Sequence, residues 1–204
     1  MIVHAVLLAA LAAAEVNEPA WTTSAARTAG AGANLIEAGA GWPGAHVSYS
    51  RGLGARFDLG ARASLNYGYE GFLQTLTGVK LQALLRLCFA DNGTVSVALT
   101  VQPGVMLYFP RSIVVGFTLP VGLIMGVAVS RSFELGFGLE LPLWTRLGFG
   151  MGLIIPLLLG VGLEYRVTPS VSVWLRARGG PTFFSYGGDP APTLDAKAGV
   201  GVRF

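Results

Sequence analysis

The sequence has few charged residues and a single cysteine, and each shortage excludes a class of protein. Charged side chains make up 12% of the 204 residues, about half of the ~25% that is typical of soluble domains. A chain that is 52% hydrophobic with a net charge of +3 also lacks the composition of a disordered protein. Cys88 has no second cysteine with which to form an internal disulfide. The 14 Lys and Arg residues form no basic cluster, which argues against a nucleic-acid partner.

The N-terminus has the features of a secretory signal. Residues 1–14 are apolar and end in Ala12-Ala13-Ala14 before Glu15. A short apolar run that ends in an Ala-x-Ala site is typical of a signal peptide, whereas a transmembrane helix needs about 20 apolar residues. We therefore expect a signal peptide over residues 1–14, an N-terminal periplasmic segment over residues 15–27 and one folded domain over residues 28–204.

Two internal stretches without charge decide between helices and strands. Residues 113–129 and 147–163 each contain a central proline, Pro120 or Pro156, and many glycines. Large apolar residues occupy the odd positions of both stretches, whereas glycine and other small residues predominate at the even positions. Side chains at positions i and i+2 share a face only in a strand. Both stretches are therefore expected to be β-strands with one strongly apolar face.

The same alternation recurs along the chain, with charge on the opposite face. Outside the N-terminal segment and the expected turns, no charged residue occupies the apolar register. This exclusion is expected of a lipid-facing surface, because a charge there costs roughly 2–4 kcal/mol at mid-bilayer. A soluble β-sandwich would show the same alternation, but the expected strands are much longer than the usual length of about 5–6 residues.

Turn signals divide residues 28–204 into ten expected strands, the first at about residues 28–41. The fold class is thus all-β, an antiparallel up-and-down transmembrane β-barrel of ten strands, with eight strands as the alternative. Aromatic residues fall near both ends of these strands, as in the interfacial girdles of membrane barrels. These expected girdle residues are Tyr49, Phe57, Phe89, Phe133 and Tyr165 at the periplasmic end and Tyr67, Tyr69, Phe109, Phe149 and Phe183 at the outer end.

The last expected strand alternates from Leu194 to the C-terminal Phe204. Together with the signal and the amphipathic strands, this ending resembles the small, porin-like outer-membrane β-barrels of Gram-negative bacteria. The resemblance covers about residues 30–204 and is one of architecture, without a family-specific motif. It implies an outer-membrane location, lipid as a partner, and recognition of Val200, Val202 and Phe204 by the barrel-assembly machinery.

The inward register carries charges of both signs, which should pair in a narrow lumen because unpaired buried charge is costly. The simplest interpretation is a side-chain-filled, salt-bridged interior with a structural role and no enzymatic activity. The alternative is a narrow porin-like channel, or a transporter of small solutes or hydrophobic ligands, which the many inward glycines favour. The expected lumen network is Arg62, Lys80, Arg86, Glu134, Glu140, Glu164, Arg176, Arg178, Asp195 and Lys197.

Enzyme motifs are few. His46 and Ser48, with Asp58 across the hairpin, have the residue types of an acyl-transfer triad. The His-x-Ser pair is similar to that of outer-membrane lipid A deacylases, and a lipid-modifying hydrolase is therefore the second alternative. In that family the pair faces lipid, whereas here both residues share the inward register. No metal-ligand spacing or cofactor motif is present, so we expect neither a metal nor a cofactor.

Overall fold

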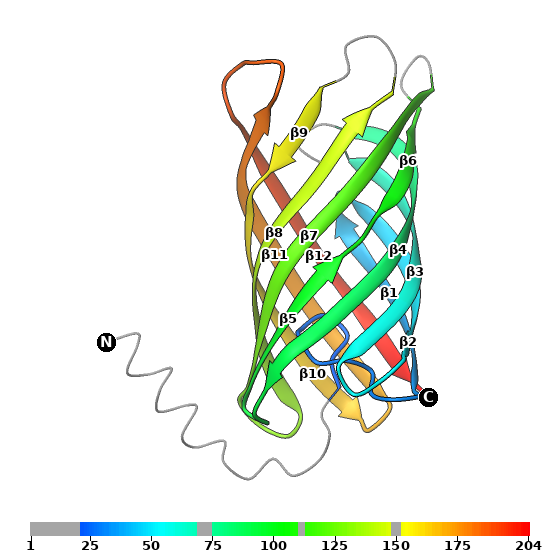
Figure 1. Ribbon diagram of the computed structural model, residues 1–204, viewed down its shortest axis with the longest axis vertical. Helices are drawn as coiled ribbons and strands as arrows, with labels where there is room; N and C mark the ends of the chain where they lie inside the picture. Colours follow the sequence, from blue (N-terminus) through cyan, green and yellow to red (C-terminus); the bar gives the residue numbers. More distant parts are fainter. Residues whose placement is uncertain (1–20, 69–74, 110–112, 148–151) are drawn as a thin grey trace, which may run out of the picture.

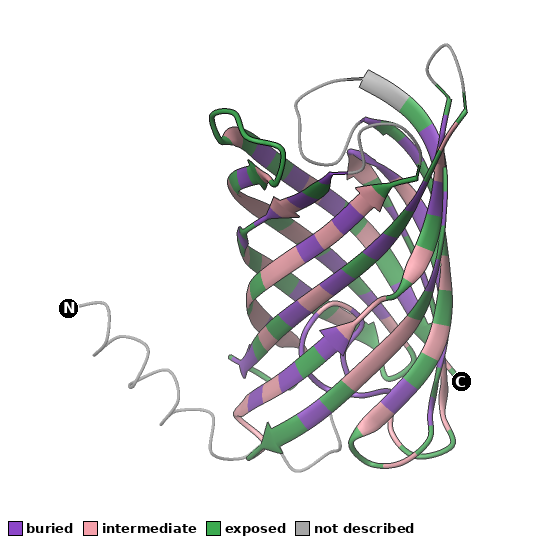
Figure 2. Cartoon of the chain, turned by 45° about the horizontal axis from the view of Figure 1, so that its top comes forward, coloured by how far each residue is buried: buried purple, intermediate pink, exposed green. Residues whose placement is uncertain are grey.

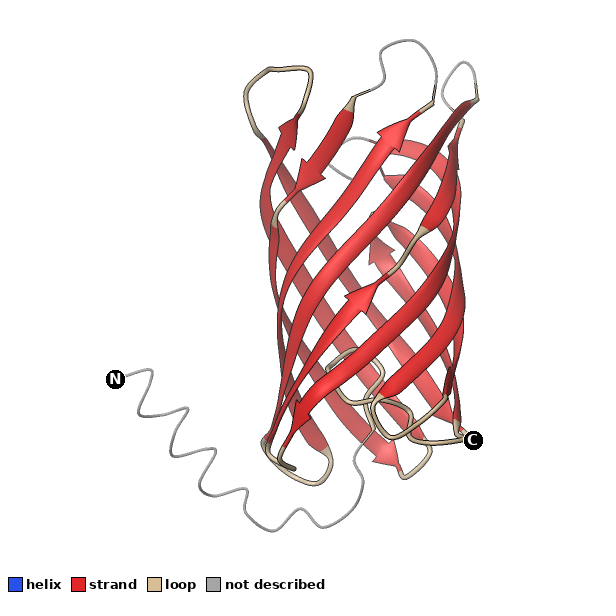
Figure 3. Cartoon of the chain, viewed as in Figure 1, coloured by secondary structure: helices blue, strands red, loops and turns tan. Residues whose placement is uncertain are grey.

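The computed structural model describes residues 21–68, 75–109, 113–147 and 152–204. Their regular secondary structure consists entirely of β-strands, as Figure 3 shows. No helix among these residues is long and apolar enough to cross a membrane. The expected signal peptide of residues 1–14 lies outside the described residues.

Twelve strand segments form ten barrel strands. Both β5 and β6 lie between β4 and β7 in one continuous register, and β9 and β10 likewise lie between β8 and β11. The prediction of ten strands is confirmed, and the alternative of eight is wrong. The segments are β1 (Asn34–Trp42), β2 (Gly44–Gly52), β3 (Phe57–Gly68), β4 (Thr75–Asp91), β5 (Val95–Val101), β6 (Gly104–Tyr108), β7 (Val114–Ala128), β8 (Phe133–Arg146), β9 (Leu153–Pro156), β10 (Leu158–Thr168), β11 (Val171–Phe184) and β12 (Ala191–Arg203).

The sheet closes on itself into a barrel (Figure 1). The first and last strands pair antiparallel, with Leu35 opposite Arg203 and Trp42 opposite Ala196. Closure pairs the backbone groups that would otherwise be exposed at the two edges of the sheet. The prediction of an antiparallel, all-β barrel is therefore confirmed.

Apolar side chains cover the outside of the barrel and polar side chains point inward. Buried and exposed residues alternate along the strands in Figure 2. On β10, for example, Leu163 and Tyr165 are exposed, whereas Glu164 between them is buried. A lipid-facing wall requires this arrangement, because hydrocarbon solvates the apolar side chains and excludes charge.

Six of the expected girdle aromatics project from the outer wall, two are half-buried, and two lie outside the described residues. Their role at the two membrane interfaces stays a prediction. The exposed ones are Tyr49, Tyr67, Phe89, Phe109, Tyr165 and Phe183; the half-buried ones are Phe57 and Phe133; Tyr69 and Phe149 are not described.

The first strand begins at Asn34 and not near residue 28 as we expected. Residues 21–33, here called the plug, turn back into the barrel lumen next to the C-terminus (Figure 1). Gly30 and Gly32 end the strand pairing there, because their φ angles of 91° and 77° lie in the left-handed region that favours glycine. The expected periplasmic segment of residues 15–27 is therefore inside the lumen from residue 21 onward.

The lumen is filled at three levels. The plug occupies the end at which the C-terminus lies (Figure 1). At the opposite end, the apolar side chains of Met106, Tyr108, Trp144 and Ile154 form a buried cluster. Between them lies the charged layer, which consists of Glu37, Arg62, Lys80, Glu140, Arg176, Arg178, Asp195 and Lys197. This filling agrees with a ten-stranded barrel, which is close in size to the eight-stranded barrels that side chains just fill.

Candidate functional site: the filled lumen

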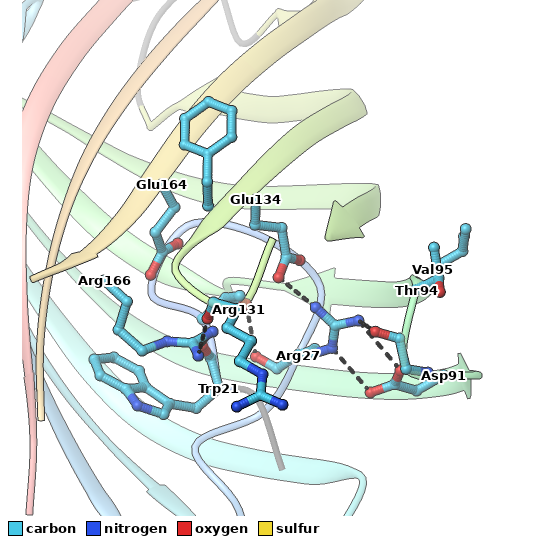
Figure 4. Close-up of polar contacts among 12 residues, drawn as sticks. Trp21, Arg27, Asp91, Thr94, Val95, Arg131, Glu134, Glu164 and Arg166 are labelled. Carbon is cyan, nitrogen blue, oxygen red and sulfur yellow. Dashed lines mark hydrogen bonds and ion pairs between the residues drawn. The ribbon is translucent and has the colours of Figure 1, made fainter. Parts of the chain in front are cut away.

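Arg27 fixes the plug to the barrel wall, as Figure 4 shows. Its guanidinium forms an ion pair with Glu134 of β8. Arg27 Nε also lies 3.2 Å from Asp91 Oδ2, and Arg27 Nη2 donates a hydrogen bond of 2.7 Å to the carbonyl oxygen of Gly93. The side chain is 2% exposed. Breaking such a buried pair is costly, so Arg27 is a strong anchor of the plug.

Two wall carboxylates accept hydrogen bonds from the backbone of the plug. Glu164 of β10 accepts from the amide of Thr23 at 2.7 Å and from that of Ser24 at 2.9 Å. Asp58 of β3 accepts from the amide of Ala29 at 3.1 Å. Buried amide groups outside a sheet need such partners, and the barrel supplies them from its inward register.

Wall arginines satisfy the carbonyl groups of the plug in the same way. Arg86 donates to the carbonyl oxygens of Thr22 and Thr23 at 2.9 and 2.8 Å and to that of Arg27 at 2.7 Å. Arg203 donates through Nε to the carbonyl oxygen of Ala29 at 2.7 Å. At this end of the lumen the charged side chains thus contact the plug, whereas we expected them to pair across an interior free of backbone.

Inward glycines leave room for the plug. A Cβ atom at Gly201 of β12 would overlap Thr23 Oγ1, and one at Gly136 of β8 would lie 3.9 Å from the Cβ of Ala25. From the sequence, the inward glycines favoured an open channel. The structure shows instead that the plug occupies the space beside these two glycines.

Ion pairs cross the charged layer. Arg62 donates to Glu37 at 3.0 Å. Arg178 contacts Glu140 and lies 2.8 Å from Asp195 Oδ2. Lys197 completes this group, with its Nζ atom 3.3 Å from the same Asp195 oxygen. The structure thus brings together seven predicted network residues, which all line one cavity: Arg62, Lys80, Glu140, Arg176, Arg178, Asp195 and Lys197.

Glu37 is a lumen residue outside the predicted network. It is 5% exposed and accepts hydrogen bonds from Arg62 and Ser48. The opposite parity of Ile36 and Ala38 already predicts an inward position for Glu37, although small residues make the alternation weak in this strand.

The acyl-transfer triad of the second alternative is not assembled. His46 Nε2 lies 3.1 Å from Glu37 Oε1, and the Ser48 hydroxyl donates to Glu37 Oε2 at 3.0 Å. A triad needs the histidine placed between the serine and the acid, whereas here both side chains contact the acid separately. Asp58 contacts the plug and not His46. The His46 ring also stacks on Trp174, with their centroids 5.9 Å apart.

The described part of the chain includes no group of three or more His, Cys, Asp or Glu side chains that could hold a metal ion. Cys88 is buried and packs with Ala26 of the plug and Ala98 of β5. Cys88 therefore belongs to the packed contact between the plug and the barrel wall.

Comparison with known proteins shows a likeness of fold. No family model and no curated protein matches the chain. The structure is similar to the crystal structure of the outer membrane protease OmpT from Escherichia coli, with a TM-score of 0.51 and 10% sequence identity. The match covers 93% of this chain and 100% of that chain.

The similarity corrects one expectation. We expected a barrel of this kind to have no enzymatic activity, but the similar structure is that of a protease. Such a fold is therefore no ground for excluding an enzyme, although the likeness itself shows only the fold. Together with the closed sheet and the apolar outer wall, it shows that the chain has the β-barrel fold found in outer-membrane proteins.

Proposed function

We propose that this protein is a sealed barrel of the bacterial outer membrane with a structural role. The observation that carries the proposal is the filling of the lumen at three levels by the plug, the charged layer and the apolar cluster. The cavity lined by the charged layer has room for only a few water molecules. A permeating solute needs a continuous water path, and the filling at these three levels argues against one.

Planar-bilayer recordings of the refolded, purified protein test this proposal. We expect no step-like openings across a range of voltages and salt concentrations. Heat-modifiable migration on a gel verifies that the inserted protein is folded. Steady openings of the folded wild type would overturn the proposal, because a sealed lumen cannot conduct.

One observation favours a second candidate function, a conduit that the plug holds closed. The seal at the periplasmic end is a chain segment, and inward glycines such as Gly136, Gly162 and Gly201 line the wall there. Removing the plug would therefore leave a hollow lower lumen. Deletion of residues 21–33 should then produce openings in the same recordings. A folded deletion variant that stays silent would rule out the plug as the gate.

A further inference from the structure

Arg176 of β11 is a cation that the described residues leave without a carboxylate partner. None of their carboxylate oxygens lies within 4.0 Å of its guanidinium. Its Nε atom is buried and makes no hydrogen bond. A guanidinium stays protonated in proteins, so this positive charge cannot be relieved by loss of a proton.

The strand partners directly opposite Arg176 carry no negative charge. In the strand register, Arg176 faces Lys197 of β12 on one side and Gly162 of β10 on the other. Like charges directly opposite one another are destabilising. The ring of Trp174, whose centroid is 5.7 Å from Arg176 Cζ, offers a cation–π contact, which is weaker than an ion pair.

The carboxylates of the charged layer are already engaged. Glu37 pairs with Arg62, whereas Glu140 and Asp195 pair with Arg178. Asp195 also contacts Lys197. Even without Lys80, four basic side chains face three acidic ones among the described residues of the layer. These residues together carry one excess positive charge.

Small cavities are present beside this excess charge. Two separate cavities are each lined by Arg176, Arg178 and Glu140. One of them also reaches Lys197, and the other reaches Ser24 of the plug. Each has room for only a few water molecules, which suits a small ion.

We propose that the lumen binds one small inorganic monovalent anion, of the size of chloride, between Arg176 and Lys197. The anion neutralises the excess charge, accepts hydrogen bonds from the guanidinium and separates two like charges. It is a fixed component of the folded barrel, and its binding does not depend on whether the lumen conducts.

Equilibrium unfolding in detergent micelles tests this site. The protein is refolded without halide and unfolded with urea in sodium gluconate, chloride or bromide at one ionic strength, so that general screening is equal. Chloride and bromide should raise the unfolding midpoint. Above the dissociation constant, the unfolding equilibrium constant should fall tenfold for each tenfold increase in halide. Gluconate, which is too large for the cavity, should have no such effect.

Variants place the effect at Arg176. Arg176→Gln should lose the halide dependence, whereas Arg146→Gln, at an exposed outer position, should keep it. Crystals of the wild type grown in bromide should show an anomalous peak beside Arg176, a readout that does not require the variant to fold. Equal midpoints in gluconate and chloride would overturn the proposal, and so would an unchanged halide dependence of Arg176→Gln or bromide crystals without the peak.

Discussion

Arg27 and Glu134 form a buried ion pair although 107 residues separate them in the chain. One partner precedes the first strand and the other lies at the start of β8. Their contact is possible only when the barrel has closed around the plug. The strength of this pair therefore reports directly on how the plug is held.

Arg27→Met should destabilise the barrel and loosen the plug. The substitution leaves Glu134, whose side chain is 4% exposed, without its main partner, and breaking such a buried pair costs about 3–5 kcal/mol. Urea unfolding measures the loss, and limited proteolysis near residues 21–33 measures the loosening. Arg146→Met, at an exposed position, should change the free energy of unfolding by less than about 0.5 kcal/mol.

The double variant Arg27→Met/Glu134→Met separates the ion pair from mere packing. Because both charges are removed, it should recover part of the stability that Arg27→Met loses. A double variant that is less stable than either single variant would contradict the assigned pairing.

Ala26→Cys should form a disulfide with the native Cys88. Ala26 of the plug is 0% exposed, Cys88 of β4 is 3% exposed, and both belong to one packed cluster. Oxidation should yield an intramolecular bond, visible as the loss of two hydrogen atoms in intact mass and as blocked alkylation. Ala177→Cys, on the exposed outer wall, should form no such bond. Rapid alkylation of residue 26 in the folded protein would mean that the plug is not inside.

Gly201→Ala should displace the start of the plug. The added Cβ would overlap Thr23 Oγ1, and this oxygen also makes a 2.8 Å hydrogen bond with the hydroxyl of Ser172. Overpacking of this kind typically costs about 1–3 kcal/mol. Gly136→Ala is the matched control, because its Cβ would have no neighbour closer than 3.8 Å. Equal unfolding midpoints for the two variants would contradict the close contact.

Gln82→Leu should be damaging only while residue 120 is proline. Gln102 and Pro120 face each other where β5 and β7 pair, and the Gln102 amide donates to the Pro120 carbonyl oxygen. Because proline has no N–H, Pro120 cannot donate to the Gln102 carbonyl oxygen in return. The side-chain amide of Gln82 donates to that oxygen instead, at 3.1 Å. Losing this bond leaves a carbonyl without a donor, which costs about 1–3 kcal/mol.

Adding Pro120→Ala supplies a backbone N–H at that position and should restore most of the stability of Gln82→Leu. Urea unfolding of the two single variants and the double variant measures this coupling. Additive effects of the two substitutions would show that the Gln82 amide does not replace the missing N–H.

The outer wall and the strand count could be predicted from the sequence because the signal is local. On β7 and β10 every second residue is large and apolar, so the period of two is unmistakable. The first strand could not be placed in the same way. Residues 28–33 consist of Thr, Ala and Gly, whose small side chains carry no pattern that separates a strand from a turn.

The sequence by itself determined which side chains face lipid and which face inward, because each strand alternates and a charge in lipid is costly. The tertiary structure alone decided what those inward charges contact. Four of them form hydrogen bonds or ion pairs with the plug, namely Asp58, Arg86, Glu134 and Glu164. Arg176, in contrast, has no carboxylate partner among the described residues. Such contacts join residues far apart in the chain. They form only when the closed barrel brings its inward side chains to the polar backbone of its own N-terminal segment.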